Sequence, residues 1–217
     1  MPAPSAARSK PLLRGLIHEL AFGLAVAAGV LLVGAARGPA AKLACGLYAA
    51  SLAGLLGISA LYHRPTWREP VRSWLRRVDH SAIFVLIAGT YTPLALTLPA
   101  PLARRMLTVA WLGAALGVVR ALFLPRARRW VVALLALTLG WASAAYLPAV
   151  HTIAGRPVTV LLALGGGLYS LGAVAYALRR PDPWPRVFGY HEVFHALVVI
   201  AAACHFAAIA TALPAAL

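Results

Sequence analysis

The sequence GYHEVFHALVVIAAACHF, residues 189–206, opens the last long apolar segment of the chain and sets His191 and His195 four residues apart. At 3.6 residues per turn, this spacing places the two imidazoles on one face of a helix. Ionisable groups in a membrane-length helix are costly, and they mark functional sites that need partners. The sequence therefore directs attention to polar residues at the ends of the other apolar segments.

Two other apolar segments carry such residues. The motif SALYH ends one segment with His63, and the motif VDH opens the next with Asp79. Zinc binds neutral imidazole nitrogens, and a catalytic zinc site usually has three protein ligands and an open fourth position. His63 and the two histidines of the last segment, His191 and His195, fill that set. The sequence thus predicts a site for Zn²⁺.

The composition identifies the class of protein. Of the 217 residues, 62% are hydrophobic and 12% are charged, and the mean hydropathy is +0.82. These values lie outside the range of soluble globular domains and indicate an all-α, polytopic membrane protein. The net charge is +15, and the basic residues stand in short clusters between apolar runs. This arrangement argues against a nucleic-acid partner. Cys45 and Cys204 lie inside apolar runs and lack metal-binding spacing, so we interpret them as packed apolar residues.

About 20 apolar residues are needed to cross a bilayer. By this criterion the chain contains seven transmembrane helices in one bundle, flanked by an N-terminal segment of residues 1–15 and a tail of residues 214–217. The membrane domain is expected to cover residues 16–213. The predicted spans are 16–36, 40–62, 78–98, 106–124, 130–150, 157–178 and 191–213.

The positions of Lys and Arg predict the orientation, because positively charged loops stay in the cytoplasm. Fifteen of the twenty Lys and Arg residues fall in the N-terminal segment and in the connections after the second, fourth and sixth spans. The other five fall on the opposite side. We therefore expect a multi-pass protein of the cell membrane with a cytoplasmic N-terminus and an external C-terminus. In this topology His63, Asp79, His191 and His195 all lie at the cytoplasmic face, so they can meet.

Each site residue also has a simpler interpretation. Histidines at a membrane boundary often face lipid headgroups. Asp79 can pair with Arg76 or Arg77 at the surface. Ser59 lies one turn before His63 on the same helix face, where it can bond a metal-bound water or Asp79, or only its own helix backbone. The sequence alone leaves these alternatives open.

The remaining histidines are weaker candidates. His205 lies ten residues after His195, about 15 Å along a helix, so we expect a helix–helix hydrogen bond rather than a place in the site. His80 points about 100° away from its neighbour Asp79 and is expected to support the site or to pack. His18 opens the first span, and Glu192 lies on another face than the two histidines beside it.

The motifs SALYH, RRVDHSAIFVLIAGTYTP and GYHEVFHALVVIAAACHF together resemble those of the haemolysin III family. Beyond that family, the chain resembles the superfamily of progestin and adiponectin receptors, which also includes alkaline ceramidases. The resemblance covers about residues 16–213. The first span departs from the family pattern, which usually shows an Asn and a Thr-His-Gly where this chain has IHELAFG.

The resemblance implies a seven-helix protein with one zinc ion. One zinc ligand is implied to come from the second helix, at His63, and two from the seventh, at His191 and His195. It also implies that Asp79 bonds the zinc-bound water and that Ser59 lies nearby as a catalytic residue. The role of His18 is not carried over.

Three functions follow as hypotheses. The first is a zinc-dependent hydrolase of lipid-like substrates, with amides favoured by the similarity to ceramidases and Asp79 in a catalytic role. The second is a pore-forming or haemolytic membrane protein, although no polar face threads the predicted spans. The third is a non-catalytic sensor or regulator in which zinc only ties the helices together. In each case the partners are the bilayer and lipid-like molecules.

Overall fold

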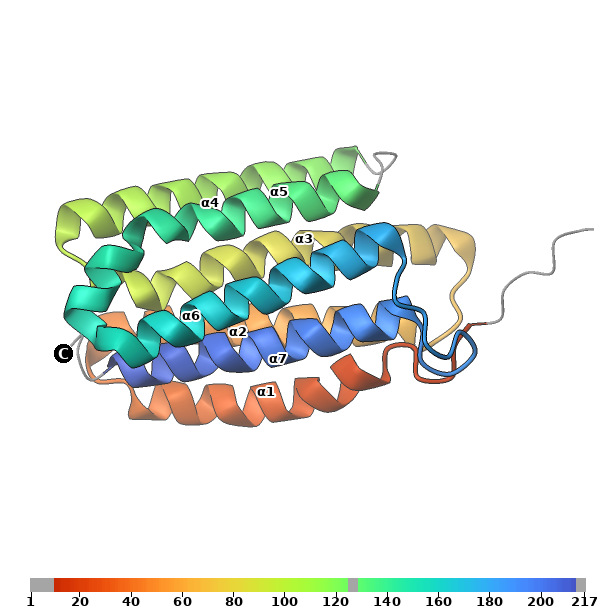
Figure 1. The fold of residues 1–217 in the computed structure, drawn as a ribbon, viewed down its shortest axis with the longest axis horizontal. Coiled ribbons are helices and arrows are strands. Elements are labelled where there is room, and N and C mark those ends of the chain that lie inside the picture. The colour runs from red at the N-terminus through yellow and green to blue at the C-terminus, as the bar shows by residue number, and fades with distance from the viewer. Residues whose placement is uncertain (1–9, 125–128, 214–217) are drawn as a thin grey trace, which may run out of the picture.

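The structure is a computed structural model, and it describes residues 10–124 and 129–213. The described chain is all-helical and forms one elongated bundle (Figure 1). A 3₁₀ helix, η1, joins α5 to α6. The elements are α1 (Leu16–Ala35), α2 (Gly38–His63), α3 (Glu69–Ala95), α4 (Ala100–Phe123), α5 (Arg129–Trp141), η1 (Ala142–Tyr146), α6 (Leu147–Leu178) and α7 (Tyr190–Ala212).

Each of the seven predicted spans coincides with helical structure, with shifted boundaries. The first, second, fourth and seventh agree most closely with α1, α2, α4 and α7. Some sequence expectations lie outside the described residues: residues 1–9 of the expected N-terminal segment, the expected tail 214–217, and Arg126 and Arg128 of the charge count.

Helix α3 begins at Glu69, not near residue 78 as predicted from hydropathy. Pro70 stands in its first turn, where the missing N–H costs nothing and the fixed φ favours a helix. Val71, Trp74 and Val78 then recur at helical spacing among arginines. This first part of α3 is therefore an amphipathic extension of the apolar segment. Because it is not continuously apolar, hydropathy alone does not predict it.

The fifth and sixth predicted spans are divided differently from the prediction. The α-helical geometry of α5 ends at Trp141, η1 follows, and α6 carries on to Leu178. Within α6, Gly155 has φ 84° and ψ 175°, which is not helical. Glycine adopts positive φ without a steric cost, so the regular helix is interrupted by a kink at this residue. The break therefore falls at Gly155, between the two predicted spans, although no loop separates them.

The helices run roughly along the long axis of the bundle, with α4 and α5 on one side and α1 on the other (Figure 1). Consecutive helices pack against each other most extensively in the pairs α1–α2, α2–α3, α3–α4 and α6–α7. Glycines allow two helices to approach closely: a Cβ at Gly117 would overlap Phe84, and one at Gly165 would overlap His205.

Large apolar side chains cover much of the outer surface. Leu24, Leu31 and Leu116 are each more than 70% exposed, although they lie in the middle of helices. Among the described residues, five helical stretches are long and apolar enough to cross a membrane: α1, α2, α4, the stretch Trp130–Leu178 and α7. An outer surface of this kind is suited to lipid rather than water. The chain is therefore a multi-pass membrane protein.

Candidate metal centre

Three histidines from two helices meet at one end of the bundle. His63 is the last residue of α2, and His191 and His195 lie in the first two turns of α7. One ring nitrogen from each histidine lies within 4.8 Å of the other two, and the Nε2 atoms of His63 and His191 are 3.1 Å apart. His191 and His195 are buried. The predicted convergence of these residues is therefore confirmed, and they do not face headgroups separately.

The three nitrogens fit a metal ion. A tetrahedral zinc with nitrogen ligands at 2.0 to 2.1 Å sets those nitrogens about 3.3 Å apart, close to the spacing found here. Neutral imidazole, with a free nitrogen lone pair, is a common metal ligand. The donor set is thus suited to a divalent ion that prefers imidazole.

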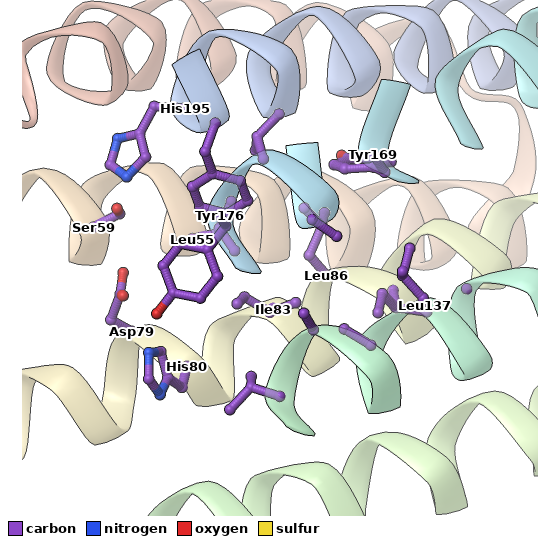
Figure 2. A pocket seen from close by; sticks show the side chains of 18 of the residues that line it. Leu55, Ser59, Asp79, His80, Ile83, Leu86, Leu137, Tyr169, Tyr176 and His195 are labelled. Carbon is purple, nitrogen blue, oxygen red and sulfur yellow. The ribbon is translucent and has the colours of Figure 1, made fainter. Parts of the chain in front are cut away.

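Asp79 and Ser59 lie beside this cluster. Figure 2 shows the Asp79 carboxylate from α3, the Ser59 hydroxyl from α2 and the His195 ring from α7 facing the same space. Ser59 is buried and its hydroxyl interacts with the Asp79 carboxylate. The described residues show no ion pair between Asp79 and Arg76 or Arg77. Asp79 thus faces the site rather than a surface arginine.

His18 is a neighbour of the cluster that the sequence did not identify. It lies in the first turn of α1, is 3% exposed, and stacks its ring on that of His195 with centroids 3.8 Å apart and planes 11° apart. A flat ring packed in this way restricts rotation of the His195 side chain. Only its position one turn into the first apolar segment could have signalled it, because the contact joins the first and last helices.

Glu192 supports the start of α7. It is 1% exposed, and its carboxylate accepts hydrogen bonds from the Arg14 guanidinium and from the backbone N–H of Gly189, the latter at 2.9 Å. A carboxylate that bonds the N–H three residues before it is half of a capping box, so the spacing Gly-x-x-Glu was the available sequence signal. Glu192 therefore has a structural role at the start of α7.

The segment before α1 runs along the α6–α7 connection at the same end of the bundle (Figure 1). The Leu12 N–H donates to the Arg186 carbonyl at 3.0 Å, and the Leu13 N–H donates to the Val187 carbonyl at 3.2 Å. Lys10 donates from Nζ to the Arg64 carbonyl at 2.7 Å. These hydrogen bonds and the Arg14–Glu192 ion pair hold residues 10–14 against the helix connections next to the histidine cluster.

A cavity of about 950 Å³ extends from the cluster into the bundle. This volume is near the upper limit of about 1,000 Å³ for small-molecule sites. Asp79, Ser59 and the three clustered histidines line the cavity, and so does His205, which lies further along α7. Beside the polar residues the lining is largely aliphatic, including Leu55, Ile83, Leu86 and Leu137 (Figure 2). The aliphatic part of the lining is suited to an apolar group, and the cluster adds polar side chains to the same cavity.

The other polar residues of the cavity occupy distinct positions. His205 bonds the Leu162 carbonyl of α6 at 3.3 Å through Nε2, which confirms the predicted helix–helix hydrogen bond. His80 lines the cavity beside Asp79, as expected for a supporting residue. Tyr176 of α6, which the sequence did not single out, packs on His191 with ring centroids 5.8 Å apart, and its hydroxyl points into the cavity (Figure 2).

Comparison with known proteins identifies the family. A family model described as "Haemolysin-III related" matches residues 6–206. The chain is 33% identical to "Hemolysin-3" of Bacillus cereus over 168 residues, which cover 76% of this chain and 73% of the relative. It is 33% identical to "Hemolysin-3 homolog" of Bacillus subtilis over 150 residues, covering 68% and 67% respectively.

A human protein also matches. "Monocyte to macrophage differentiation factor" of Homo sapiens is 30% identical over 176 residues, which cover 77% of this chain and 69% of that relative. The family model's match, residues 6–206, includes α2, α3 and most of α7, the helices that carry the candidate site. The chain therefore belongs to the haemolysin III family, within the superfamily of progestin and adiponectin receptors.

Proposed function

We propose that this protein is a zinc-dependent hydrolase of lipid-like amides. The observation that carries the proposal is the position of the histidine cluster, with Asp79 and Ser59, at the polar end of a long aliphatic cavity. An imidazole set alone would serve a structural metal equally well. A carboxylate facing the set, next to a space large enough for a substrate, is the arrangement that hydrolysis requires.

In this proposal His63, His191 and His195 hold the zinc ion. When bound, zinc lowers the pKa of a coordinated water toward 7 and polarises a carbonyl group. The remaining steps belong to the protein. An Asp79 carboxylate oxygen accepts the proton of the attacking water and then delivers it to the nitrogen of the leaving amine. The Ser59 hydroxyl holds this carboxylate in position by hydrogen bonding.

The cavity provides orientation and excludes water. Aliphatic side chains such as Leu55 and Leu86 bury an acyl chain, which contributes about 0.8 kcal/mol for each buried CH₂. Binding of the chain fixes the distance from its carbonyl carbon to the cluster. Stacking of His18 on His195 and the Glu192 cap of α7 keep two of the imidazoles in place, and preorganisation of this kind raises the rate of reaction.

The activity is tested with purified protein. Zinc-loaded protein is expected to release fatty acid from at least one member of a panel of N-acyl lipids, to lose that activity after removal of zinc by a chelator, and to regain it when zinc is restored. The readout is fatty acid measured by mass spectrometry. A chelated sample that remains as active as the loaded one would contradict a zinc-dependent reaction.

The second candidate is membrane lysis, and the observation that favours it is the name "Hemolysin-3" of the Bacillus cereus relative. A dye-release assay on liposomes separates the two functions, since hydrolysis of lipid amides does not require leakage. If wild-type protein is inactive in both assays but binds zinc, the third hypothesis, a sensor with structural zinc, is favoured.

We also propose seven crossings of the cell membrane, with residues 16–213 as the membrane domain between two short terminal segments. Gly155 supports two crossings in the stretch Trp130–Leu178, because 49 residues exceed what one span needs. Helix α3, with 27 residues, is long enough for another. An odd number of crossings then puts the two termini on opposite sides.

The orientation is a separate prediction. The Lys and Arg asymmetry implies a cytoplasmic N-terminus, an external C-terminus and a site that opens toward the cytoplasm. A reporter fused after Leu217 is expected to behave as external, and one inserted near Glu69 as cytoplasmic. Alkaline phosphatase and a fluorescent protein, which report the two compartments oppositely, provide the readout. The reverse pattern in both fusions would contradict the proposed orientation and place the N-terminus outside.

A further inference from the structure

Positively charged side chains gather at the cluster end of the cavity. Arg14 is one of them, and it is neutralised by Glu192. The cavity has two lining carboxylates, Asp79 and Asp182, and Asp182 accepts the Tyr190 backbone N–H at 2.9 Å. The other positively charged residues that line the cavity are Lys10, Arg72, Arg76, Arg120 and Arg179.

None of these five makes an ion pair with a described residue, since the ion pairs there are Arg14–Glu192 and Arg64–Glu19. Positive charge in connections on one side of a membrane is normal, but such residues ordinarily extend toward headgroups and water. Here five of them line the cavity that holds the candidate site. Because they line the cavity, these residues are placed to bind a ligand as well as to set the orientation of the protein in the membrane.

Arg120 is the most informative of the five. It lies in the last turn of α4, lines the cavity, and has a buried Nη2 atom without a hydrogen-bond partner among the described residues. A guanidinium keeps its charge at every physiological pH and presents donors in a planar fork that suits carboxylate and phosphate. Leaving a buried charged donor unpaired is costly. An anion at this position would remove that cost.

Lys10 gives independent support from outside the membrane-spanning segments. Burial lowers the pKa of Lys10, and the charges of Arg14, Arg64 and Arg72 lower it further. The positively charged groups at this end are thus close enough to repel one another. A bound anion would attract each of these positively charged groups and so offset the repulsion between them.

We infer that the ligand of this cavity is an amphiphile with a hydrocarbon chain and an anionic head group, a carboxylate or phosphate, bound by Arg120 and the neighbouring arginines. For the amide substrate this inference rests on the proposed function, and it specifies an N-acyl lipid whose amine portion carries the anion. The chain lies along the aliphatic lining, the amide lies at the cluster, and the anion lies at the arginines.

Binding is measured first, with probes that contain no amide. Hexadecyl phosphate, hexadecanol and inorganic phosphate are compared as ligands of the detergent-purified, zinc-loaded protein by thermal shift and by equilibrium binding. Hexadecyl phosphate is expected to bind at least 10-fold more tightly than either other probe. Its affinity should fall on the order of 10-fold or more in Arg120→Gln, because a charge-assisted hydrogen bond is lost, and Arg120→Lys should recover part of it.

The matched control is Arg105→Gln. Arg105 is an exposed arginine of the same helix and does not line the cavity, so its replacement should leave affinity for hexadecyl phosphate unchanged. Equal binding of hexadecanol and hexadecyl phosphate by the wild type would overturn the anionic head group. Binding of inorganic phosphate as tight as that of hexadecyl phosphate would show a site for a soluble anion and would overturn the lipid.

Hydrolysis is measured second, with N-palmitoylglycine and N-palmitoylethanolamine, which share an acyl chain and differ in the charge of the head. The anionic amide should be hydrolysed with the lower KM, and Arg120→Gln should raise that KM while changing the KM of the neutral amide little. Anion-dependent binding without hydrolysis would support this inference and contradict the proposed function. Hydrolysis of both amides with equal KM, unaffected by Arg120→Gln, would support the function and overturn the inference.

Discussion

Replacement of His63 or His191 by alanine is expected to remove bound zinc from the purified protein, which in the wild type should contain about one zinc per chain. The three ring nitrogens converge within 4.8 Å, so each provides about a third of the protein's ligands. Loss of a supporting residue around a metal usually weakens binding 10- to 100-fold, and loss of a direct ligand should weaken it more. Zinc is measured by mass spectrometry in protein eluted as a folded peak.

His205→Ala is the matched control for this prediction. His205 is also a histidine of α7 and lines the same cavity, but it lies further along the helix and bonds the Leu162 carbonyl. Its replacement should leave the zinc content near one per chain, with at most a lower melting temperature. Unchanged zinc content in both His63→Ala and His191→Ala would contradict the assignment of the site.

Asp79→Asn is expected to keep zinc and to lower the rate of amide hydrolysis 10²- to 10⁴-fold, the usual contribution of a general base. The amide is close in size to the carboxylate, so the packing beside Ser59 is preserved, but it cannot take a proton from the attacking water. Because Asp79 is not among the three converging nitrogen ligands, its replacement should not release the metal. Rate and zinc content are measured on the same preparation.

Asp182→Asn provides the comparison. Asp182 lines the same end of the cavity, but its carboxylate is occupied by the Tyr190 N–H, a bond that an asparagine side-chain oxygen can also accept. This variant should retain most of the activity. If Asp79→Asn is as active as the wild type, Asp79 has no part in the mechanism; if it loses zinc as well as activity, its role is to hold the metal site together.

Much of the site could be predicted from sequence because its signals are local. The HxxxH spacing fixes His191 and His195 on one helix face, and the charge pattern of the connections sets which helix ends share a side of the membrane. These two rules bring His63 to the same end, and the rise per residue along the helix excludes His205. The apolar segments likewise indicate the helices, since length and hydropathy are properties of the chain itself.

Apolar length did not predict helix boundaries correctly where a helix is only partly apolar or where a glycine interrupts the helical backbone. The two cases are the amphipathic first part of α3, from Glu69, and the kink at Gly155 inside one long helical stretch. Pro70 and the helical recurrence of Val71 and Trp74 do mark the start of α3, but a search for apolar length does not use them.

The surroundings of the cluster were decided only by the tertiary structure. Stacking of His18 on His195 and pairing of Arg14 with Glu192 each join the beginning of the chain to its last helix. The aliphatic cavity likewise depends on how several helices pack together, as does the Arg120 Nη2 atom, which lacks a hydrogen-bond partner among the described residues. Periodicity and charge counts describe one helix at a time, whereas a contact between distant segments depends on the rotation and depth of both helices, which only the packed bundle determines.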